Sequence, residues 1–493
     1  MNVGGPTRLS FLLQKIRLYW NSEKNQTELI ELRIFSVVLA AGQGKRMKSK
    51  LYKVLHPVCG KPMVGHVVDT LEQLNCSRTV VIVGHGAEAV QGYLGERTEF
   101  ALQAQQLGTG HAVKQAQALL GGEDGVTFIL CGDAPLIRAT SLQAMLDQHL
   151  SKGAAATVLT AKMDNPIGYG RMIRDENGDI RRIVEQKDCS PEEAAVNEIN
   201  TGTFCFDNRK LFHALGQVKN ENAQNEYYLT DVIGILKATG ETVIGYCTDD
   251  PAEAIGVNDR IALADAERML RERINRSHML NGVTIIDPSA TYIEKDVVIG
   301  SDTVLYPGTW LKGSTSIGSE CVIGPNTEVT NSTVSDEVTI KQSIVIQSQI
   351  GKHAAVGPFA YLRPGTKLGD DVKVGDFVEI KNTSIGNGSK VSHLSYLGDA
   401  VVGEHVNVGC GAITVNYDGV NKHLTEIGDG AFIGSNVNLI APVKIGKRAY
   451  VVAGSTITHD VPADDLAIAR QRQTNKSGYA AKLRDRILIR KNR

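Results

Sequence analysis

Residues 427–440 read IGDGAFIGSNVNLI, with aliphatic side chains at Ile427, Ile433 and Leu439, six positions apart. The same spacing runs through residues 293–329, 350–380 and 427–457, and a glycine often follows the aliphatic residue. Neither the helical period of about 3.6 nor strand alternation produces this pattern. A six-residue period is typical of a parallel β-helix of triangular section, in which one aliphatic side chain per flat face points inward. We therefore predict a left-handed parallel β-helix of hexapeptide repeats over residues 283–460.

The amino-acid composition agrees with this prediction. The chain has 50 glycines among 493 residues, above the usual share of about 7%, and only 5% aromatic residues. The six-residue phase breaks near residues 331–345, 381–385 and 415–426. These breaks predict loops, where binding and catalytic residues tend to gather.

Length, charge and cysteine usage limit the class of protein. At about 150 residues per domain, 493 residues correspond to roughly three units. Lys+Arg 53 against Asp+Glu 54 leaves a net charge of −1, so no global basic field exists for a nucleic acid or an anionic membrane. The eight cysteines show neither C-x-x-C pairs nor zinc-finger spacing, which favours reduced thiols in a cytoplasmic protein. No apolar stretch reaches the length of a membrane span, about 18 residues.

Residues 1–33 precede the first clear strand. Within them, residues 10–20 read SFLLQKIRLYW, and Gln14, Lys15 and Arg17 interrupt the apolar run. A secretory signal needs an unbroken apolar core and a cleavage site of small residues. We expect an extension without function, and a basic amphipathic surface helix is the alternative.

An α/β unit is predicted over residues 34–258. The run FSVVL at 35–39 indicates a buried strand, and strands at 79–83, 126–130 and 156–160 alternate with helical patterns at 63–74 and 110–120. This alternation is typical of a Rossmann-like, mostly parallel sheet with helices on its faces. Ligands of such sheets bind beyond the carboxyl ends of the strands.

The loop after the first strand favours phosphate binding. It reads AAGQGKRM over residues 40–47, and Gly42 and Gly44 would let backbone N–H groups approach an anion closely. The dinucleotide fingerprint fails at Met47, and no G-K-[ST] sequence completes a Walker motif. Asp133 follows a predicted buried strand, where it could hold Mg²⁺ or cap the next helix.

Eight blocks carry a family resemblance, and they occur in this order: LAAGQGKRM 39–47, KVL 53–55, QLGTG 106–110, GDAPL 132–136, GYGR 168–171, EINTG 198–202, EYY 226–228 and GVN 256–258. Together they resemble the sugar-1-phosphate nucleotidyltransferase family. The family signature usually reads GxGTRM and then PKVL, so Lys45 and Tyr52 depart from it. The resemblance implies that UTP reacts with a sugar 1-phosphate in the presence of Mg²⁺. It also implies site residues for the nucleotide (Leu39, Ala40, Ala41, Gly42, Lys53, Gln103, Gly108, Thr109), for the sugar (Gly170, Glu185, Asn200) and for the metal (Asp133, Asn258).

Residues 259–282 predict one long amphipathic helix. Apolar residues recur there at helical spacing between Arg and Glu, and Gly282 is a suitable stop. This helix is a spacer between the two halves, with partner binding as the alternative. Residues 461–493 form the C-terminal tail.

The β-helical half resembles the hexapeptide acyltransferases, which are commonly homotrimers with active sites between neighbouring subunits. The blocks are RPG 363–365, VEIK 378–381, VSHLSY 391–396, GD 398–399, NVGC 407–410, VNYDG 415–419, GS 434–435 and IAR 468–470. The resemblance implies a catalytic base (His393), sugar-phosphate ligands (Arg363, Lys381, Tyr396, Asn407) and acetyl-CoA ligands (Cys410, Asn416, Tyr417, Ser435, Ala453, Arg470).

The chemistry of acetyl transfer supports the residue roles that this resemblance implies. An amine that attacks a thioester must lose a proton, and a neutral imidazole suits that task near pH 7. We expect Glu379 to orient His393. Cys410 as an acyl-carrying nucleophile is the less favoured alternative, because nothing in the sequence indicates an activated thiol.

The two resemblances together imply a bifunctional transferase that makes UDP-N-acetylglucosamine. Acetyl-CoA would acetylate glucosamine 1-phosphate, and UTP would then react with N-acetylglucosamine 1-phosphate and release pyrophosphate. One alternative is a nucleotidyltransferase whose β-helix is structural or regulatory. Another is a trimerising scaffold for a binding module with inactive sites.

Overall fold

The computed structural model of the chain describes residues 16–21 and 26–491. Its Cα positions divide into two compact units, Met1–Arg273 and Ile274–Arg493. The boundary in the sequence falls within helix α10 (Arg260–Leu280), which matches the helix predicted over residues 259–282.

The N-terminal extension contains a two-stranded hairpin. Strand β1 (Ile16–Asn21) pairs antiparallel with β2 (Gln26–Glu31). The alternative of a surface helix over residues 10–20 is therefore wrong over residues 16–20, because that backbone pairs with a second strand. Residues 10–15 lie outside the described residues.

The first unit is built on a nine-stranded sheet whose main path runs β11-β10-β12-β8-β3-β6-β7, with β9 paired to β12 and β13 to β9. Strands β8, β3, β6 and β7 are parallel, as predicted. Strand β12 runs antiparallel to β8 and β9, so the sheet is mixed beyond that point. The strands are β3 (Ile34–Leu39), β6 (Arg78–Val83), β7 (Glu99–Leu102), β8 (Val126–Cys131), β9 (Ala156–Lys162), β10 (Gly170–Arg174), β11 (Ile180–Val184), β12 (Glu198–Asp207) and β13 (Val243–Cys247).

The helices of this unit follow the predicted alternation with one difference. The helix expected over residues 110–120 is two short helices, because Gln115 and Ala116 separate them. The helices are α2 (Met63–Gln73), α3 (Ala87–Leu94), α4 (Thr109–Lys114), α5 (Gln117–Leu120), α6 (Ala139–Ser151), α7 (Pro191–Ala194), α8 (Asn208–Leu215) and α9 (Asp231–Ala238).

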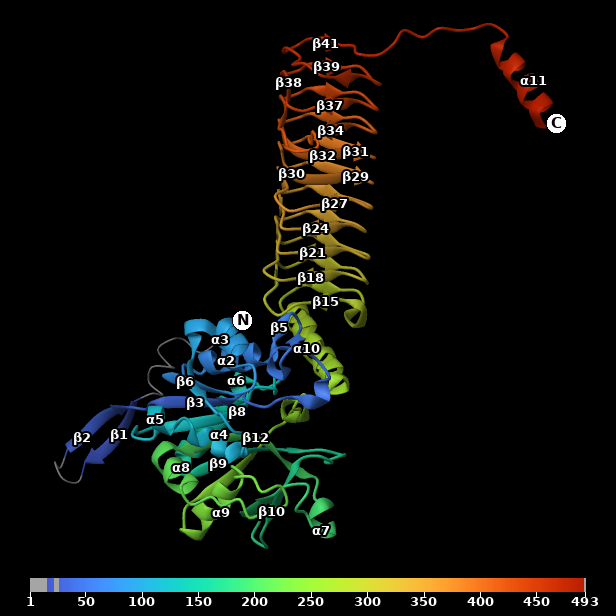
Figure 1. The fold of residues 1–493 in the computed structure, drawn as a ribbon. Coiled ribbons are helices and arrows are strands. Elements are labelled where there is room, and N and C mark those ends of the chain that lie inside the picture. The colour runs from blue at the N-terminus through green and yellow to red at the C-terminus, as the bar shows by residue number, and fades with distance from the viewer. Residues whose placement is uncertain (1–15, 22–25, 492–493) are drawn as a thin grey trace. The chain divides into compact units, whose positions relative to one another are not determined.

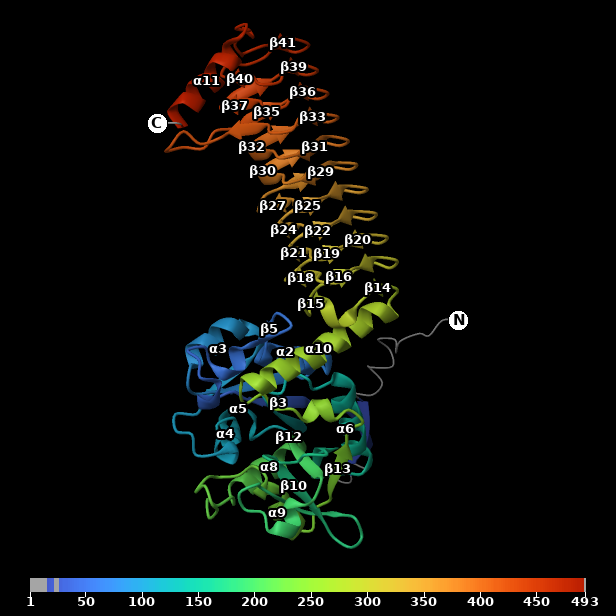
Figure 2. The ribbon, with the colours of Figure 1, turned by 90° about the vertical axis from the view of Figure 1, so that its right-hand side faces the viewer.

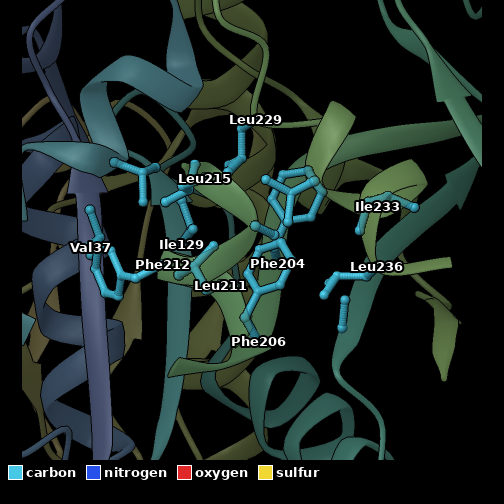
Figure 3. Packing of buried hydrophobic residues seen from close by; sticks show 14 of the residues in the cluster. Val37, Ile129, Phe204, Phe206, Leu211, Phe212, Leu215, Leu229, Ile233 and Leu236 are labelled. Atoms are coloured by element: carbon cyan, nitrogen blue, oxygen red, sulfur yellow. The ribbon is translucent and has the colours of Figure 1, made fainter. Parts of the chain in front are cut away.

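The sheet carries a hydrophobic core on each face. Val37 and Ile129 belong to one buried cluster, whereas their neighbours Val38 and Leu130 belong to the other. Successive side chains of a strand point to opposite faces, so strands buried on both faces become continuous apolar runs. In Figure 3, Phe204 and Phe206 of β12 lie between Ile129 and the side chains of α9.

The second unit is a left-handed parallel β-helix, as predicted. Leu311 pairs in parallel with Val329 on the following coil, and both side chains are fully buried. Figures 1 and 2 show the strands stacked in order from β15 to β41. One face is an 11-stranded sheet: β14 (Thr284–Ile285), β17 (Val304–Leu305), β20 (Val322–Ile323), β23 (Thr339–Ile340), β26 (Ala355–Val356), β29 (Lys373–Asp376), β31 (Lys390–His393), β33 (Asn407–Val408), β36 (Phe432–Ile433), β39 (Tyr450–Val451) and β41 (Leu466–Ala467).

The remaining strands of the β-helix join into one 17-stranded sheet. Its members are β15 (Tyr292–Ile293), β16 (Val298–Ile299), β18 (Trp310–Lys312), β19 (Ser316–Ile317), β21 (Glu328–Thr330), β22 (Thr333–Val334), β24 (Ile344–Ile346), β25 (Gln349–Ile350), β27 (Tyr361–Leu362), β28 (Lys367–Leu368), β30 (Glu379–Ile385), β32 (Tyr396–Val402), β34 (Ile413–Val415), β35 (Thr425–Ile427), β37 (Asn438–Ile440), β38 (Val443–Ile445) and β40 (Thr456–Ile457).

Only one of the three predicted loops is present. Val329 pairs with Val345, so the break at 331–345 is a coil shorter than the one before it, and the loop expected there is wrong. Residues 381–385 lie inside β30, so the second expected loop is also wrong. The third is confirmed, since the coil that joins Ala400 to its partner Thr425 is longer than its neighbours and its extra residues form a loop. Deleting a residue at a corner shifts the sequence phase and leaves the strand pairing intact.

The C-terminal end of the β-helix reaches beyond residue 460. Strand β41 pairs in parallel with β39, and helix α11 (Tyr479–Lys491) follows with all its side chains exposed. Among residues 16–21 and 26–491, we find no helix that combines the length and the apolar character needed to cross a bilayer.

Candidate functional sites

The loop after β3 makes a close turn over the edge of the sheet. Ala40 N–H donates to Ile82 O at 2.9 Å, which continues the strand pairing, and Gly44 then adopts a left-handed φ of 62°. A Cβ at Gly44 would lie 2.5 Å from the Cβ of Lys53. A glycine is therefore required for Lys53 to approach the loop.

A cavity of about 260 Å³ opens at this edge. Nine predicted nucleotide or metal residues line it: Leu39, Ala40, Ala41, Gly42, Lys53, Gln103, Gly108, Thr109 and Asp133. Sequence reasoning assigned no role to the other lining residues, which are Val54, Gln106, Ala112, Cys131 and Glu226. Gln106 and Glu226 belong to blocks of the family resemblance, which is the signal that could have identified them.

The two predicted metal ligands converge on one point. The Lys53 ammonium forms an ion pair with Asp133 Oδ2 and donates to Asn258 Oδ1 at 2.9 Å. Both oxygens thus lie within hydrogen-bond reach of a single positive centre. A carboxylate and an amide oxygen are hard ligands that suit Mg²⁺, which usually takes one or two carboxylates, water and phosphate oxygens. The donor set fits a magnesium ion shared with a bound nucleotide.

A second cavity of about 290 Å³ adjoins this point and is lined by Gln43, Gly44, Lys45, Arg46, Lys53 and Asn258. Within the described part of the chain, neither Lys45 nor Arg46 forms an ion pair. The departure at Lys45 therefore adds a positive charge beside a cavity. Tyr52, which replaces the proline of the family signature, packs its ring against Gly86, where a Cβ would overlap the ring.

The predicted nucleotide-binding segment from Gln103 to Thr109 is held by the chain itself. Gln103 is buried, and its Nε2 donates to Gly108 O at 3.1 Å. Leu229 N–H donates to Thr109 Oγ1 at 3.0 Å. These contacts fix the segment that lines one wall of the cavity.

The three predicted sugar ligands lie together. Gly170 pairs with Asn200 across β10 and β12, and a Cβ at Gly170 would lie 3.6 Å from Glu185 Oε2. Burial raises the pKa of Glu185, against a hydrogen bond from Thr230 that lowers it. The Sγ of Cys131, which lines the first cavity, contacts Gly202 O on the strand that carries Asn200, so the sugar residues adjoin this cavity.

The predicted base on the β-helix has a carboxylate partner. His393 Nδ1 lies 2.6 Å from Asp376 Oδ1, and β29 and β31 pair these two residues in register. The hydrogen bond from His393 lowers the pKa of Asp376. Because a carboxylate accepts, Nδ1 carries the proton and Nε2 keeps its lone pair. The expectation that Glu379 orients His393 is wrong, since Glu379 Oε1 pairs with Arg363 Nη1 at 2.7 Å.

Several predicted acetyl-CoA residues stack beside His393 on successive coils. The registers of β31 with β33, β33 with β36 and β36 with β39 place Cys410, Ser435 and Ala453 one above another. Backbone hydrogen bonds confirm the stacking: Asn436 N–H donates to Cys410 O at 2.7 Å, and Gly454 N–H to Ser435 O at 2.8 Å. We call Asp376, His393, Cys410, Ser435 and Ala453 the His393 ladder.

The predicted phosphate clamp lies on the 17-stranded sheet, where the register of β27 with β30 places Arg363 one coil before Lys381. The neighbouring ammonium of Lys422 lowers the pKa of Lys381, and Arg363 is also close. Asn416 is buried, and its Nδ2 donates to Asp399 Oδ2 at 2.5 Å. Asp399 keeps a lowered pKa because amide hydrogen bonds and both lysines outweigh its burial. This positive cluster suits an anion such as a phosphate.

The other predicted residues occupy the surroundings of these two groups. Tyr396 begins β32 and pairs with Glu379 on the preceding coil. Tyr417 is exposed in the loop after β34, where its hydroxyl donates to Gly419 O at 2.6 Å. Asn407 lies on β33, shortly before Cys410 in the sequence, and Arg470 packs against Gly454, where a Cβ would lie 3.7 Å from Arg470 Cδ.

A glycine-containing loop beside two converging side-chain oxygens, followed by a hexapeptide β-helix with an Asp–His pair, is the arrangement of a transferase with two sites. The nucleotidyl transferase family model matches residues 35–252, the GMPPB C-terminal domain matches residues 280–376, and the bacterial transferase hexapeptide model matches residues 424–459. The chain is 58% identical to the "Bifunctional protein GlmU" of a Geobacillus species over 93% of this chain and 99% of that protein. The proteins of the same name from Bacillus subtilis and Bacillus velezensis are 59% and 60% identical, each over 90% of this chain and 98% of theirs.

The chain belongs to the GlmU family. It is a uridylyltransferase of N-acetylglucosamine 1-phosphate and an acetyltransferase of glucosamine 1-phosphate, as the two resemblances implied. The family relation covers both units, so a purely structural β-helix is not favoured. Uridylyl transfer in this family involves a divalent metal.

Proposed function

We propose that uridylyl transfer takes place in the cavity beside Lys53 and that Mg²⁺ is the metal, held by Asp133 and Asn258. The observation that supports this assignment is the single positive centre shared by these two oxygens. When bound there, Mg²⁺ would neutralise phosphate charge and fix the nucleotide for in-line attack. Residues 34–258 carry this activity, and residues 259–282 link them to the acetyltransferase, whose β-helix starts near residue 283 and ends with β41 at Ala467. Residues 1–33 have no role in either reaction.

The chain supplies position and charge for this reaction. A phosphate oxygen of N-acetylglucosamine 1-phosphate forms a bond to the α-phosphorus of UTP, and the bond to the pyrophosphate breaks. No covalent intermediate on the protein is needed. Gln103, Gly108 and Thr109 hold the uracil, and Gly170, Glu185 and Asn200 hold the sugar. Lys53 releases Asp133 and Asn258 and moves its ammonium to the phosphates.

Acetyl transfer takes place along the His393 ladder. The amine of glucosamine 1-phosphate attacks the thioester carbon of acetyl-CoA, and Nε2 of His393 takes the amine proton. The C–S bond then breaks, and the imidazolium of His393 gives the proton to the departing sulfur, so that CoA leaves as a thiol. Asp376 accepts from Nδ1–H, which orients the ring and balances the charge of the imidazolium. Arg363 and Lys381 hold the sugar phosphate.

The other predicted ligands complete this second site. Tyr396 and Asn407 hold the sugar. Acetyl-CoA runs along the ladder past Cys410, Ser435 and Ala453 toward Arg470, and Asn416 and Tyr417 contact it from the neighbouring face. The C-terminal tail, residues 461–493, therefore contributes Arg470 to this site.

We also propose that the β-helices assemble as a homotrimer. Phe359, Phe377 and Leu394 stand at successive corners with φ of 59°, 55° and 45°, and they are 51%, 57% and 58% exposed. Large apolar side chains in left-handed conformations are uncommon, and an exposed apolar ridge marks a contact surface. Further copies of the chain would remove this ridge from water. A Phe377→Asp variant should then lose trimer mass in analytical ultracentrifugation, whereas a monomeric wild type would contradict the proposal.

We place the enzyme in the cytoplasm, where UTP and acetyl-CoA are available.

Separate assays of the two reactions test the assignments. His393→Ala should abolish acetyl transfer and leave uridylyl transfer intact, and Asp133→Ala should do the reverse. Loss of both activities in either variant would indicate a folding defect. Wild-type UDP-sugar formation that persists after chelation of divalent cations, or in Asp133→Ala, would contradict the metal assignment.

A further inference from the structure

Glu253 is a buried carboxylate that has no part in either transfer reaction as described above. It lies in the short 3₁₀ helix η4 (Pro251–Ala254), and its side chain is 0% exposed. Oε1 forms an ion pair with Nε of Arg138 and accepts from Ser141 Oγ at 2.8 Å and from Thr248 Oγ1 at 3.1 Å. Oε2 accepts from the backbone N–H of Arg138 at 3.2 Å. Both oxygens therefore have donors within the protein, and the carboxylate is not free to bind a ligand.

Glu253 joins the two chain segments that carry the predicted metal ligands. Arg138 belongs to the connection between β8 and α6, which also carries Asp133, and we call this connection the Asp133 segment. Glu253 belongs to the connection between β13 and α10, which also carries Asn258, and we call this connection the Asn258 segment. Next to the ligands, Val257 N–H donates to Asp133 O at 2.9 Å. The two segments are therefore bonded to each other beside the ligands and again where Glu253 contacts Arg138.

A more exposed contact joins the same two segments. Arg273 of α10 donates to Leu136 O at 2.6 Å and pairs with Asp250 Oδ2 at 2.7 Å. The side chains of Arg273 and Asp250 are 27% and 32% exposed, so water competes with this ion pair. The Glu253 carboxylate is excluded from water, and hydrogen bonds are stronger in such surroundings. Glu253 is therefore better suited than Arg273 to fix the separation of the two metal ligands.

We propose that Glu253 is a positioning residue of the metal site, which holds Asp133 and Asn258 at the separation that one cation needs. The proposal rests on the assignment of the metal to these two residues in the proposed function. Mg²⁺ demands near-ideal geometry and takes few ligands from the protein, so a change in their separation weakens its binding. Residues that orient metal ligands without touching the metal typically change metal affinity or activity by about 10–100-fold.

Glu253→Gln is the variant that tests this role. Gln keeps the size of the side chain, but its amide NH₂ replaces one acceptor oxygen with a donor, which then opposes an N–H of Arg138. Thr248→Val and Ser141→Ala each remove one hydroxyl donor and leave the carboxylate in place, and they carry the test if Glu253→Gln does not fold. Asp69→Asn is the matched control, because Asp69 of α2 pairs with one lysine and one arginine at 2.6 Å each and is not among the residues that line either cavity.

The test measures metal binding and substrate binding separately in the full-length enzyme. Mn²⁺ is the probe, and electron paramagnetic resonance follows its binding to the enzyme saturated with UDP-N-acetylglucosamine, without pyrophosphate and hence without turnover. Glu253→Gln should raise the dissociation constant of Mn²⁺ about tenfold, and the two hydroxyl variants should raise it by a smaller factor. The affinity for UDP-N-acetylglucosamine in the presence of EDTA should stay within a factor of about two. Asp69→Asn should leave both constants unchanged.

Steady-state kinetics provide a second measurement. In Glu253→Gln, the Mg²⁺ concentration that gives half-maximal uridylyl transfer should rise about tenfold, and saturating Mg²⁺ should restore kcat. A residue that only stabilises the fold would lower the activity at every Mg²⁺ concentration alike, and that result would overturn the proposal.

Two binding results would also overturn it. One is an unchanged dissociation constant of Mn²⁺ in Glu253→Gln, or in both hydroxyl variants if Glu253→Gln does not fold. The other is an equal loss of metal-free affinity for UDP-N-acetylglucosamine. Asp133→Ala separates this proposal from the metal assignment. Mn²⁺ binding that persists in Asp133→Ala would refute the metal assignment and the role of Glu253 with it, whereas binding that is lost in Asp133→Ala and unchanged in Glu253→Gln would refute the role of Glu253 alone.

Discussion

Asp376 is the residue whose substitution best tests the acetyl-transfer mechanism. In Asp376→Ala, His393 loses the acceptor that holds its ring and keeps the proton on Nδ1. We expect kcat for acetyl transfer to fall, with little change in the KM for either substrate. Neither substrate contacts Asp376 in the proposed arrangement, so the substitution acts through His393.

The geometry sets the expected size of this loss. In a buried Ser-His-Asp triad, disabling the carboxylate lowers kcat by about 10⁴. Here the side chains of His393 and Asp376 are 59% and 38% exposed, so water can replace part of the hydrogen bond. We therefore expect a reduction of about tenfold in Asp376→Ala and a smaller one in Asp376→Asn, which keeps an acceptor oxygen. His393→Ala should lower kcat for acetyl transfer by a factor of about 10²–10⁴, the usual contribution of a general base.

Steady-state kinetics with acetyl-CoA and glucosamine 1-phosphate measure these effects, and uridylyl transfer reports folding. Glu379→Gln is the matched control, because Glu379 pairs with Arg363. That variant should change the KM for the sugar phosphate rather than kcat. In the His393→Ala background, Asp376→Ala should add no further loss, since both act as one unit. An unchanged kcat in Asp376→Ala, together with a lowered kcat in Glu379→Gln, would refute the reasoning.

Three further predictions concern other parts of the chain. Since the Lys422 ammonium lowers the pKa of Lys381, Lys381 loses its proton earlier as pH rises, and phosphate binding weakens there. Lys422→Met should move this alkaline rise in the KM for glucosamine 1-phosphate to higher pH; a rise at the same pH would contradict the pairing. Gly44→Ala should suppress uridylyl transfer and spare acetyl transfer, because the new Cβ would lie 2.5 Å from Lys53 Cβ, and equal activity in both assays would disprove it. Leu311→Ala leaves a cavity at a fully buried site and should destabilise the β-helix by about 2–5 kcal/mol, measured by chemical denaturation; a smaller change would mean that the coil closes around the gap.

The fold could be predicted where one physical period dominates the sequence. Interior positions of the β-helix recur every six residues because each flat face needs one inward aliphatic side chain, and Leu311 over Val329 shows the result. The strand leading to Leu39 was equally clear, since burial on both faces makes its residues continuously apolar. The antiparallel placement of β12 could not be read in this way. Its pairing with β8 joins Phe204 to Ile129, far apart in the chain, and local sequence does not encode such contacts.

Some residues of the candidate sites could likewise be predicted from the sequence, and others could not. The motif residues around the first cavity come from loops at strand ends, and parallel strands bring those loops together at one edge. Chemistry and motif resemblance were therefore sufficient to expect Asp133 and Asn258 near each other. Glu226 was missed because no strand end marks its position, although it also lines the cavity. Lys45 shows the limit of a motif. The sequence shows that Lys45 departs from the family pattern, but only the structure shows that it lines a cavity.

The length of each coil varies along the β-helix. The coil that joins Asp376 to His393 is slightly shorter than the regular coil from Leu311 to Val329, because a corner residue is missing. The coil that ends at Thr425 is much longer, because it contains a loop. A fixed repeat therefore loses the register wherever a coil gains or loses residues.

The partner of His393 depends on this register. A residue on a β-helix lies above the residue one full coil earlier, and for His393 that residue is Asp376. Glu379 is nearer in the sequence but begins β30, the next strand around the corner, so proximity along the chain selects the wrong carboxylate. The buried aliphatic residues that pair between coils, such as Val374 with Val391, give the length of each coil. That length also gives the pairing of the exposed residues, such as Asp376 with His393. The His393–Asp376 pair is then as predictable as the core that positions it.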